Sequence, residues 1–253
     1  ELQRLAQEFG IREQNFEPQL REIAKDKSTP SLIFDSQKCI SCGRCAQVCQ
    51  EIQGVWALEF IGRGFDMNIA PAGDLVLNES PCVKCGQCSA HCPVGAIVER
   101  DEVETVWKGL IDPEKHAVVQ FAPAVRVAFG EGFKEDSGEI VTNKLYTLLR
   151  KLGFKTVFDT NFAADVTIME EGSEFVDKFK NAPQSLPLIT SCCPGWVDYL
   201  EKYYPSMIEH FSTAKSPQQM MSALTKTYYA EKNGIDPKDI FMVSIMPCTA
   251  KKF

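Results

Sequence analysis

The sequence lacks the features that nucleic-acid-binding and membrane proteins need. Its 253 residues carry 27 lysines and arginines against 34 aspartates and glutamates, a formal net charge of −7, whereas nucleic acid requires a basic face. No apolar run approaches the roughly 18 residues of a membrane-spanning helix, and no signal peptide is evident. Histidine is scarce: His91, His116 and His210 have no partners at metal-ligand spacing. We therefore expect no nucleic acid, no membrane span and only structural histidines.

Cysteine, by contrast, is abundant and clustered. Eight of the 11 cysteines form two copies of the spacing Cys-x2-Cys-x2-Cys-x3-Cys. This is the spacing of bacterial two-cluster ferredoxins, in which three cysteines of one run and the fourth of the other hold a 4Fe–4S cubane. The pattern predicts one cubane on Cys39, Cys42, Cys45 and Cys92. It predicts a second cubane on Cys82, Cys85, Cys88 and Cys49.

Disulfides and zinc account for these runs less well. Cysteines three residues apart on a tight loop rarely have the geometry of a disulfide, and zinc usually takes cysteines as separated pairs. Clustered reduced thiols are typical of a reducing compartment. We therefore expect a cytoplasmic protein that moves electrons through two 4Fe–4S clusters.

The chain is long enough for two domains. Residues 1–30 predict a short amphipathic helix, ended by Gly10, and a linker. Residues 31–105 hold both cysteine runs, an internal repeat with strand-like pieces such as residues 55–60 between them. From 106 to 253 helices alternate with strands, which is typical of an α/β domain with a parallel sheet.

Three further cysteines follow predicted strands of this second region. We expect strands at residues 116–121, 155–158, 188–189 and 240–246, and helices at 138–152 (with Leu148 and Leu152 inward), 162–180 and 217–232. Cys192 and Cys193 follow the strand at 188–189, and Cys248 follows the strand at 240–246. Because parallel sheets bind ligands at the carboxyl ends of their strands, we expect these cysteines at one sheet edge. The alternative is that they are buried core residues, but their polar-flanked turns disfavour it.

The segments around these cysteines resemble a known family. Thr190-Ser191-Cys192-Cys193-Pro194-Gly195-Trp196 and Met246-Pro247-Cys248-Thr249-Ala250-Lys251 are similar to the first two signature motifs of the iron–iron hydrogenases. The resemblance covers residues 31–253 and implies an α+β ferredoxin-like two-cluster domain followed by a partial α/β parallel-sheet catalytic domain. It implies that Cys193 and Cys248 ligate the cubane of the active-site H-cluster, a 4Fe–4S unit joined to a di-iron unit. Cys192 is then the free thiol that exchanges protons with the di-iron unit.

The resemblance also implies a proton path and a set of residues around the di-iron unit. The path leads from Cys192 through Glu171 and Ser212 to Glu174 near solvent. Such a relay needs groups that both donate and accept protons. Glu171 and Glu174 share a helix face at i, i+3, although they could be two solvated carboxylates. The residues implied around the di-iron unit are Ala122, Pro123, Met246, Gln218 and Lys251, the last as a donor to a cyanide ligand.

The leading hypothesis is an iron–iron hydrogenase unit that catalyses 2H⁺ + 2e⁻ ⇌ H₂. Its electrons would come from ferredoxin and/or flavin-containing subunits that oxidise NAD(P)H. The alternative is a non-catalytic relative in redox sensing or iron–sulfur assembly, which would have no use for Cys192 and both glutamates. A plain electron-transfer module leaves residues 102–253 unexplained. Because the family's third motif, with two more cysteine ligands, should lie beyond residue 253, we expect a longer polypeptide and no hydrogenase activity from these residues alone.

Overall fold

The computed structural model describes residues 2–13 and 23–253. The chain divides into two compact units. The first comprises residues 1–28, 33–80 and 87–98, and the second comprises residues 29–32, 81–86 and 99–253. The first half of the second cysteine run, residues 81–86, therefore belongs to the second unit.

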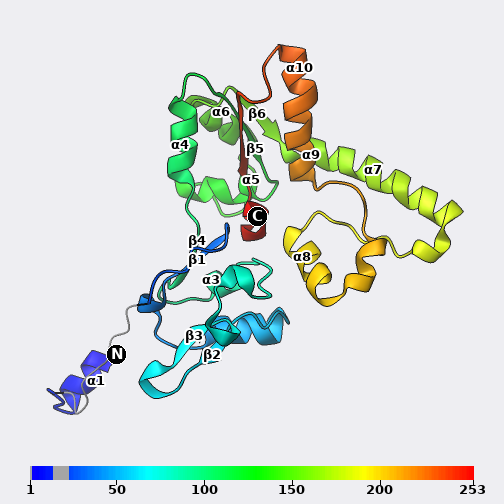
Figure 1. Ribbon diagram of the computed structural model, residues 1–253. Coiled ribbons are helices and arrows are strands. Elements are labelled where there is room, and N and C mark those ends of the chain that lie inside the picture. Colours follow the sequence, from blue (N-terminus) through cyan, green and yellow to red (C-terminus); the bar gives the residue numbers. More distant parts are fainter. Residues whose placement is uncertain (1, 14–22) are drawn as a thin grey trace. The chain divides into compact units, whose positions relative to one another are not determined.

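The first unit consists of short elements joined by turns (Figure 1). Its helices are α1 (Leu2–Glu8), α2 (Arg44–Gln47), which continues into the π-helical turn η2 (Val48–Ile52), and α3 (Gln87–Ala90). The strands β2 (Glu59–Ile61) and β3 (Asn68–Ala70) pair antiparallel. The strands β1 (Leu32–Phe34) and β4 (Ile97–Glu99) form a second small sheet, of which the end residues Leu32 and Glu99 are counted with the second unit. The first unit also contains short 3-10 turns at η1 (Ser36–Lys38), η3 (Gly64–Asp66), η4 (Ala72–Asp74) and η5 (Leu77–Glu79).

The apolar core of the first unit is small. Phe34, Leu58, Ile69, Leu77 and Ile97 are almost fully buried. Thiols from both cysteine runs are buried beside this core, at Cys45 and Cys88. Elements of three or four residues bury little apolar surface, and small domains of this kind usually need metal sites or disulfides to be stable.

The second unit is built on a three-stranded parallel sheet in the order β6-β5-β7. Its strands are β5 (His116–Phe121), β6 (Thr156–Asp159) and β7 (Ile240–Ile245). Val119 is opposite Val157 on one side and Val243 on the other. The connecting helices are α4 (Val103–Ile111), α5 (Val125–Ala128), α6 (Thr142–Leu152), α7 (Thr160–Asn181), α8 (Pro194–Tyr203), α9 (Pro217–Leu224) and α10 (Ala230–Asn233). The remaining turns are η6 (Phe129–Phe133), η7 (Pro183–Ser185), η8 (Pro205–His210), the π-helical η9 (Thr225–Tyr229) and η10 (Thr249–Lys252).

Helices cover both faces of this sheet, as the alternation along β5 requires. Ala117, Val119 and Phe121 pack with Leu145 and Leu149 of α6, and apolar side chains of α4 join this cluster. The opposite face contributes Val118, which packs with Ala230 of α10. In Figure 1, α4 and α6 lie on one side of the sheet and α9 and α10 on the other. The predicted fold class, a two-cluster ferredoxin-like part followed by a parallel α/β sheet, is confirmed.

The predicted strand at residues 188–189 is wrong. Ile189 makes only an isolated parallel bridge to Phe211, outside the three-stranded sheet. Its amide donates to the carbonyl of His210 at 2.8 Å. The segment lies between Pro187 and Pro194, and proline has no N–H to donate to a ladder, so little of it can pair. Cys192 and Cys193 therefore do not reach their position through a sheet edge.

Smaller differences concern the helix at 138–152 and the predicted linker. Leu149 is buried at 3% exposure, whereas the expected Leu152 is 38% exposed, because the helix begins at Thr142 and turns a different face inward. Thr29, assigned to the linker, is fully buried and its hydroxyl donates to the carbonyl of Leu32 at 3.0 Å. Residues 14–22 of the predicted linker lie outside the described residues.

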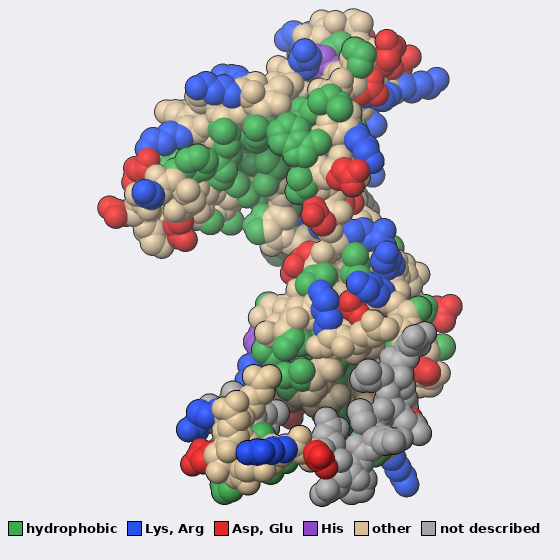
Figure 2. All heavy atoms as spheres, turned by 90° about the vertical axis from the view of Figure 1, so that its left-hand side faces the viewer, with side chains coloured by type: hydrophobic (Ala, Val, Ile, Leu, Met, Phe, Trp, Pro, Cys, Tyr) green, Lys and Arg blue, Asp and Glu red, His purple; other side chains and the backbone are tan. Residues whose placement is uncertain are grey.

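The surface of the second unit carries exposed apolar side chains. On α4 they are Val103, Trp107 and Ile111, at 59%, 48% and 77% exposure. Hydrophobic side chains gather in the upper part of Figure 2, on the face to which α4 belongs. Among the described residues, no helix is both long and apolar enough to cross a membrane.

Candidate metal centres and proton path

Four cysteines of the first unit line one cavity. They are Cys39, Cys42, Cys45 and Cys92, the ligand set that the spacing predicts for the first cubane. Apolar side chains such as Phe34 complete the lining. In the part of the chain that the structure describes, no three His, Cys, Asp or Glu side chains converge to bind a single metal ion. Thiols spread around an apolar cavity, rather than meeting at a point, fit a multi-atom cluster.

The thiols of this cavity differ in their electrostatics. Burial raises the pKa of Cys45 to about 11. Burial also acts to raise the pKa of Cys92, but backbone N–H groups that follow it lower that pKa overall. One of them, the amide of Ala96, is 3.2 Å from the Cys92 sulfur. Because iron binds thiolate, the loop after Cys92 favours the ligating form.

The second cysteine run is divided between the two units. Cys82 and Cys85 lie in the second unit, whereas Cys88 on α3 and Cys49 in η2 lie in the first. Within the first unit, α3 packs against η2. The amide of Ala57 donates to the Cys49 sulfur at 3.3 Å. The joint ligation of a second cubane by these four cysteines stays a prediction.

Cys193 and Cys248 start adjoining helical segments of the second unit. Cys193 is the N-cap of α8, with Pro194 as the first helical residue, and Cys248 is the N-cap of η10. α8 packs against η10. The ammonium of Lys251 donates to the backbone carbonyl of Cys192 at 3.0 Å. Contact between two helix starts therefore brings the two motifs together.

The residues implied around the di-iron unit lie mainly in the same unit near the end of β7. Gln218, Met246, Cys248 and Lys251 line one cavity. Ala122 follows β5, and its amide donates to the carbonyl of Ile245 at 3.0 Å. Pro123 comes next and is exposed. Of the expected set, the structure places Gln218, Met246 and Lys251 around this cavity, together with the predicted ligand Cys248, and Ala122 beside the strand that leads into it.

Sequence reasoning missed the buried amide of Gln120. This residue is 0% exposed and lies in the middle of β5. Its Nε2 donates to the carbonyl of Gln218 at 3.0 Å and to the hydroxyl of Ser244 at 2.9 Å. Its Oε1 accepts from the hydroxyl of Thr160 at 3.1 Å. A glutamine within the apolar string HAVVQF was the available signal, since buried amides need several partners.

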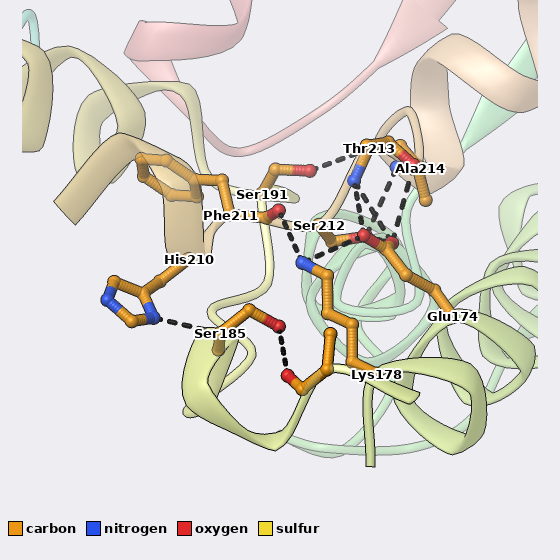
Figure 3. Close-up of polar contacts among 10 residues, drawn as sticks. Glu174, Lys178, Ser185, Ser191, His210, Phe211, Ser212, Thr213 and Ala214 are labelled. Carbon is orange, nitrogen blue, oxygen red and sulfur yellow. Dashed lines mark hydrogen bonds and ion pairs between the residues drawn. The ribbon is translucent and has the colours of Figure 1, made fainter. Parts of the chain in front are cut away.

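Glu174 and Ser212, the predicted solvent end of the proton path, are directly hydrogen-bonded (Figure 3). The Ser212 hydroxyl donates to the Glu174 carboxylate at 2.9 Å, and the amide of Thr213 donates at 3.1 Å. Lys178 forms an ion pair with Glu174 at 3.2 Å. Burial acts to raise the pKa of Glu174, but Ser212, Lys178 and Thr213 outweigh it and hold the pKa below its ordinary value.

The inner end of the path is only partly connected. The Ser191 hydroxyl donates to the carbonyl of Ala214 at 2.7 Å, which ties the cysteine pair to the loop of Ser212 (Figure 3). Glu171 is half-buried on α7. Within the described residues, no hydrogen bond joins Glu171 to Ser212 or Cys192. Its place in the path stays a prediction.

Comparison with known proteins agrees with this arrangement. Residues 115–253 match the family described as iron only hydrogenase large subunit, C-terminal domain. Residues 38–96 match the family described as 4Fe-4S dicluster domain. Since the first match covers more than half of the chain, the chain belongs to the iron-only hydrogenase family. The sequence resemblance and the two 4Fe–4S clusters of the cysteine runs are thereby confirmed.

Individual relatives place the chain more closely. It is 48% identical over 259 residues to the NADP-reducing hydrogenase subunit HndD of Solidesulfovibrio fructosivorans, covering 100% of this chain and 44% of that protein. It is 37% identical over 143 residues to cytosolic iron-sulfur assembly component 3 of Rattus norvegicus, covering 55% of this chain and 30% of that protein. The apo form of a variant of FeFe-hydrogenase HydA1 from Chlamydomonas reinhardtii matches with a TM-score of 0.57 and 49% identity, over 60% of this chain and 39% of that one. The chain thus spans less than half the length of these proteins.

Proposed function

We propose that this chain supplies the electron relay and the first part of the active site of an iron–iron hydrogenase, which catalyses 2H⁺ + 2e⁻ ⇌ H₂. One observation carries the proposal. The Lys251 ammonium donates to the carbonyl of Cys192, so the cysteine pair and the Met-Pro-Cys segment lie together at one place in the second unit. Cys248 and Lys251 line one cavity, and a thiol beside an ammonium group is suited to an anionic, thiolate-bound cluster.

The proposed roles divide between holding the H-cluster and moving protons. Cys193 and Cys248 would ligate its cubane, and Lys251 would donate to its anionic ligands. When bound, the H-cluster supplies the chemistry of the H–H bond, as cofactors generally do. Ala122, Pro123, Met246 and Gln218 would surround it. The shared cavity at the end of β7 supports these roles for Cys248, Lys251, Met246 and Gln218.

Protons would pass along side chains of this chain. Glu174 takes up a proton near solvent, and the Ser212 hydroxyl, 2.9 Å away, passes it inward. Glu171 and then the thiol of Cys192 complete the relay. The lowered pKa of Glu174 favours the carboxylate, which is the form able to accept a proton. The same proposal includes two further points. The domains comprise residues 1–30, 31–105 and 106–253, and the protein is located in the cytoplasm.

The partners would be electron donors. The similarity to a subunit of an NADP-reducing hydrogenase supports an assembly with flavin-containing, NAD(P)H-oxidising subunits, with ferredoxin as a further donor. The second candidate function, iron–sulfur assembly, is favoured by the likeness to an assembly component. That relative has lower identity and matches a smaller part of the chain than the hydrogenase subunit does. A protein of that class should produce no hydrogen.

The test compares Cys192→Ala with Cys193→Ala in the full-length protein. Cys192→Ala should retain the H-cluster spectrum but lose at least about 100-fold in hydrogen evolution, because alanine cannot carry a proton. Cys193→Ala should lose the cluster itself. Cys192→Asp, which keeps a proton-carrying group, should recover part of the activity. If Cys192→Ala loses the cluster while Cys193→Ala keeps it, the roles are reversed. If the wild-type protein with its clusters produces no hydrogen, the assembly function stands instead.

A further inference from the structure

Lys84, between the predicted ligands Cys82 and Cys85, is a buried cation. Its side chain is 8% exposed, and its Nζ lies 3.0 Å from a carboxylate oxygen of Asp198, which is 16% exposed. Its backbone φ is +59°, in the left-handed region that residues other than glycine rarely adopt. A buried lysine is costly unless it is paired. The cysteine spacing requires neither this charge nor this backbone conformation.

The ion pair belongs to a larger contact between the Cys82–Cys85 loop and α8. Lys202, one helical turn beyond Asp198, lies 2.9 Å from the other oxygen of the same carboxylate. The Lys202 ammonium also donates to the carbonyl of Cys82 at 2.9 Å. One carboxylate and two ammonium groups therefore join the loop to the helix that begins after Cys193, and the cations outnumber the anion.

The same loop contacts the segment after Cys248. The Thr249 hydroxyl donates to the carbonyl of Lys84 at 2.7 Å. The Lys84 ammonium also lies 4.3 Å from the centre of the Phe253 ring, a favourable cation–π distance. Residues 81–86, α8 and η10 all belong to the second unit. The loop is thus attached to both segments that start at the proposed H-cluster ligands.

Two glycines show how closely these backbones approach. A Cβ atom at Gly86 would lie 2.5 Å from the Thr249 hydroxyl oxygen. A Cβ atom at Gly195 would lie 3.2 Å from the carbonyl oxygen of Val83. Side chains at these positions would push the loop away. The loop therefore packs closely against α8 and η10, with Lys84 as its buried charge and Asp198 of α8 as the partly buried partner.

We propose that Lys84 and Asp198 are positioning residues that set the reduction potential of the second-run cubane and hold its loop against the H-cluster segments. This inference rests on the proposed function. A cation beside an iron–sulfur cluster favours the reduced form, which carries one more negative charge, and so raises the potential. Asp198 limits that rise. When bound, the second-run cubane would supply one-electron transfer without making or breaking a bond, and the role of Lys84 and Asp198 would be to set its charge environment and the position of its loop.

The experiment is a redox titration of the anaerobically reconstituted full-length protein, followed by electron paramagnetic resonance. Lys84→Met should lower the potential of the second-run cubane, with about a tenfold change in its oxidised-to-reduced ratio, which is 59 mV for a one-electron couple. Asp198→Asn should shift the potential in the opposite direction. Lys84→Arg keeps the charge and should stay near wild type. The cubane on Cys39, Cys42, Cys45 and Cys92 is the internal reference and should not move.

Opposite signs distinguish electrostatics from structural damage, since both Lys84→Met and Asp198→Asn break the ion pair. The matched control is Lys108→Met, which breaks the exposed pair with Glu104, at 72% and 84% exposure, and should leave both potentials unchanged. Shifts of equal sign, or no shift in a retained cubane, would overturn the inference. If Lys84→Met loses the cubane, Asp198→Asn alone tests the inference. A shift of the second-run cubane to higher potential supports it, and a shift to lower potential overturns it. Absence of a second-run cubane from the wild-type protein would instead contradict the proposed function.

Discussion

The two units of this chain are stabilised in different ways. The first has strands of three residues and helices of four to seven, with thiols of Cys45 and Cys88 buried beside a small apolar core. The second has a parallel sheet whose central strand, β5, is buried at five of six positions and covered by helices on both faces. We therefore expect the first unit to depend on its metal clusters for stability, and the second on the packing of its apolar side chains.

Removal of iron should have the largest effect, and it should destabilise the first unit far more than the parallel sheet of the second. With clusters bound, the two cysteine runs should hold roughly eight iron atoms. Without iron, amides of β2 and β3 should lose most of their protection from hydrogen exchange, because metal binding is coupled to folding in small domains, while amides of β5 stay protected. Iron analysis and hydrogen-exchange mass spectrometry with and without a chelator measure this.

A single substitution should halve the iron of the cysteine runs. Cys45→Ser removes a ligand of the first cubane, so about four irons should remain there. Equal protection from hydrogen exchange in both units without iron would contradict the expected difference in stability between them. Bound zinc in place of iron would contradict it as well.

A cavity in the sheet should destabilise the second unit alone. Phe121→Ala removes a fully buried ring at the end of β5 and should cost about 3–5 kcal/mol in free energy of unfolding. Chemical denaturation of the cluster-loaded protein, followed by hydrogen exchange of β5 amides, measures the loss. The control is Ile111→Ala at a 77% exposed position, which should change stability by no more than about 0.5 kcal/mol. Equal losses for the two variants would show that β5 is not the core.

The buried amide of Gln120 should have a smaller effect. Gln120→Leu removes the donor to the Ser244 hydroxyl and the acceptor of the Thr160 hydroxyl, and leaves the Gln218 carbonyl with the Ser222 hydroxyl as its side-chain donor, which should cost about 1–3 kcal/mol. Denaturation under the same conditions measures it. Gln120→Glu, which keeps the shape but replaces the amide donor, should be no more stable than Gln120→Leu. A variant as stable as wild type would mean that these polar groups find other partners.

The smallest effect concerns the pH dependence around Glu174. Because the pKa of Glu174 is lowered in the folded state, its interactions stabilise the fold above the unfolded pKa and are lost as pH falls through the folded pKa. Ser212→Ala removes one donor, so the pKa of Glu174 should rise. The variant should be less stable by about 1–2 kcal/mol near neutral pH, and this difference should narrow below about pH 4.

Carbon-13 NMR titration of the Glu174 carboxylate and denaturation at several pH values test this expectation. The control is Ser173→Ala, since the Ser173 hydroxyl donates only within α7, to the carbonyl of Met169. A pKa of Glu174 that is unchanged in Ser212→Ala would show that Lys178 and Thr213 set it without Ser212.

The sequence by itself determined the cofactor class, the family and most of the elements. Cysteine spacing indicates which thiols can surround a cubane, because three ligands with two residues between successive cysteines can wrap one face of it. Strand β5 and helix α7 follow from continuous apolar or amphipathic runs, which local residue pattern alone specifies. The pair Glu174–Ser212 was expected, but through the family resemblance and not through any local pattern.

Only the tertiary structure decided how the second half of the site is assembled. Residues 188–189 were expected in the sheet, yet Ile189 pairs with Phe211 alone, and contact between α8 and η10 brings the cysteines together instead. Gln120 and Lys84 gained their roles from partners far away in the chain, at Gln218 and Asp198. Such pairings depend on how remote segments pack, because a buried polar group must be hydrogen-bonded or ion-paired with a group that the fold places beside it.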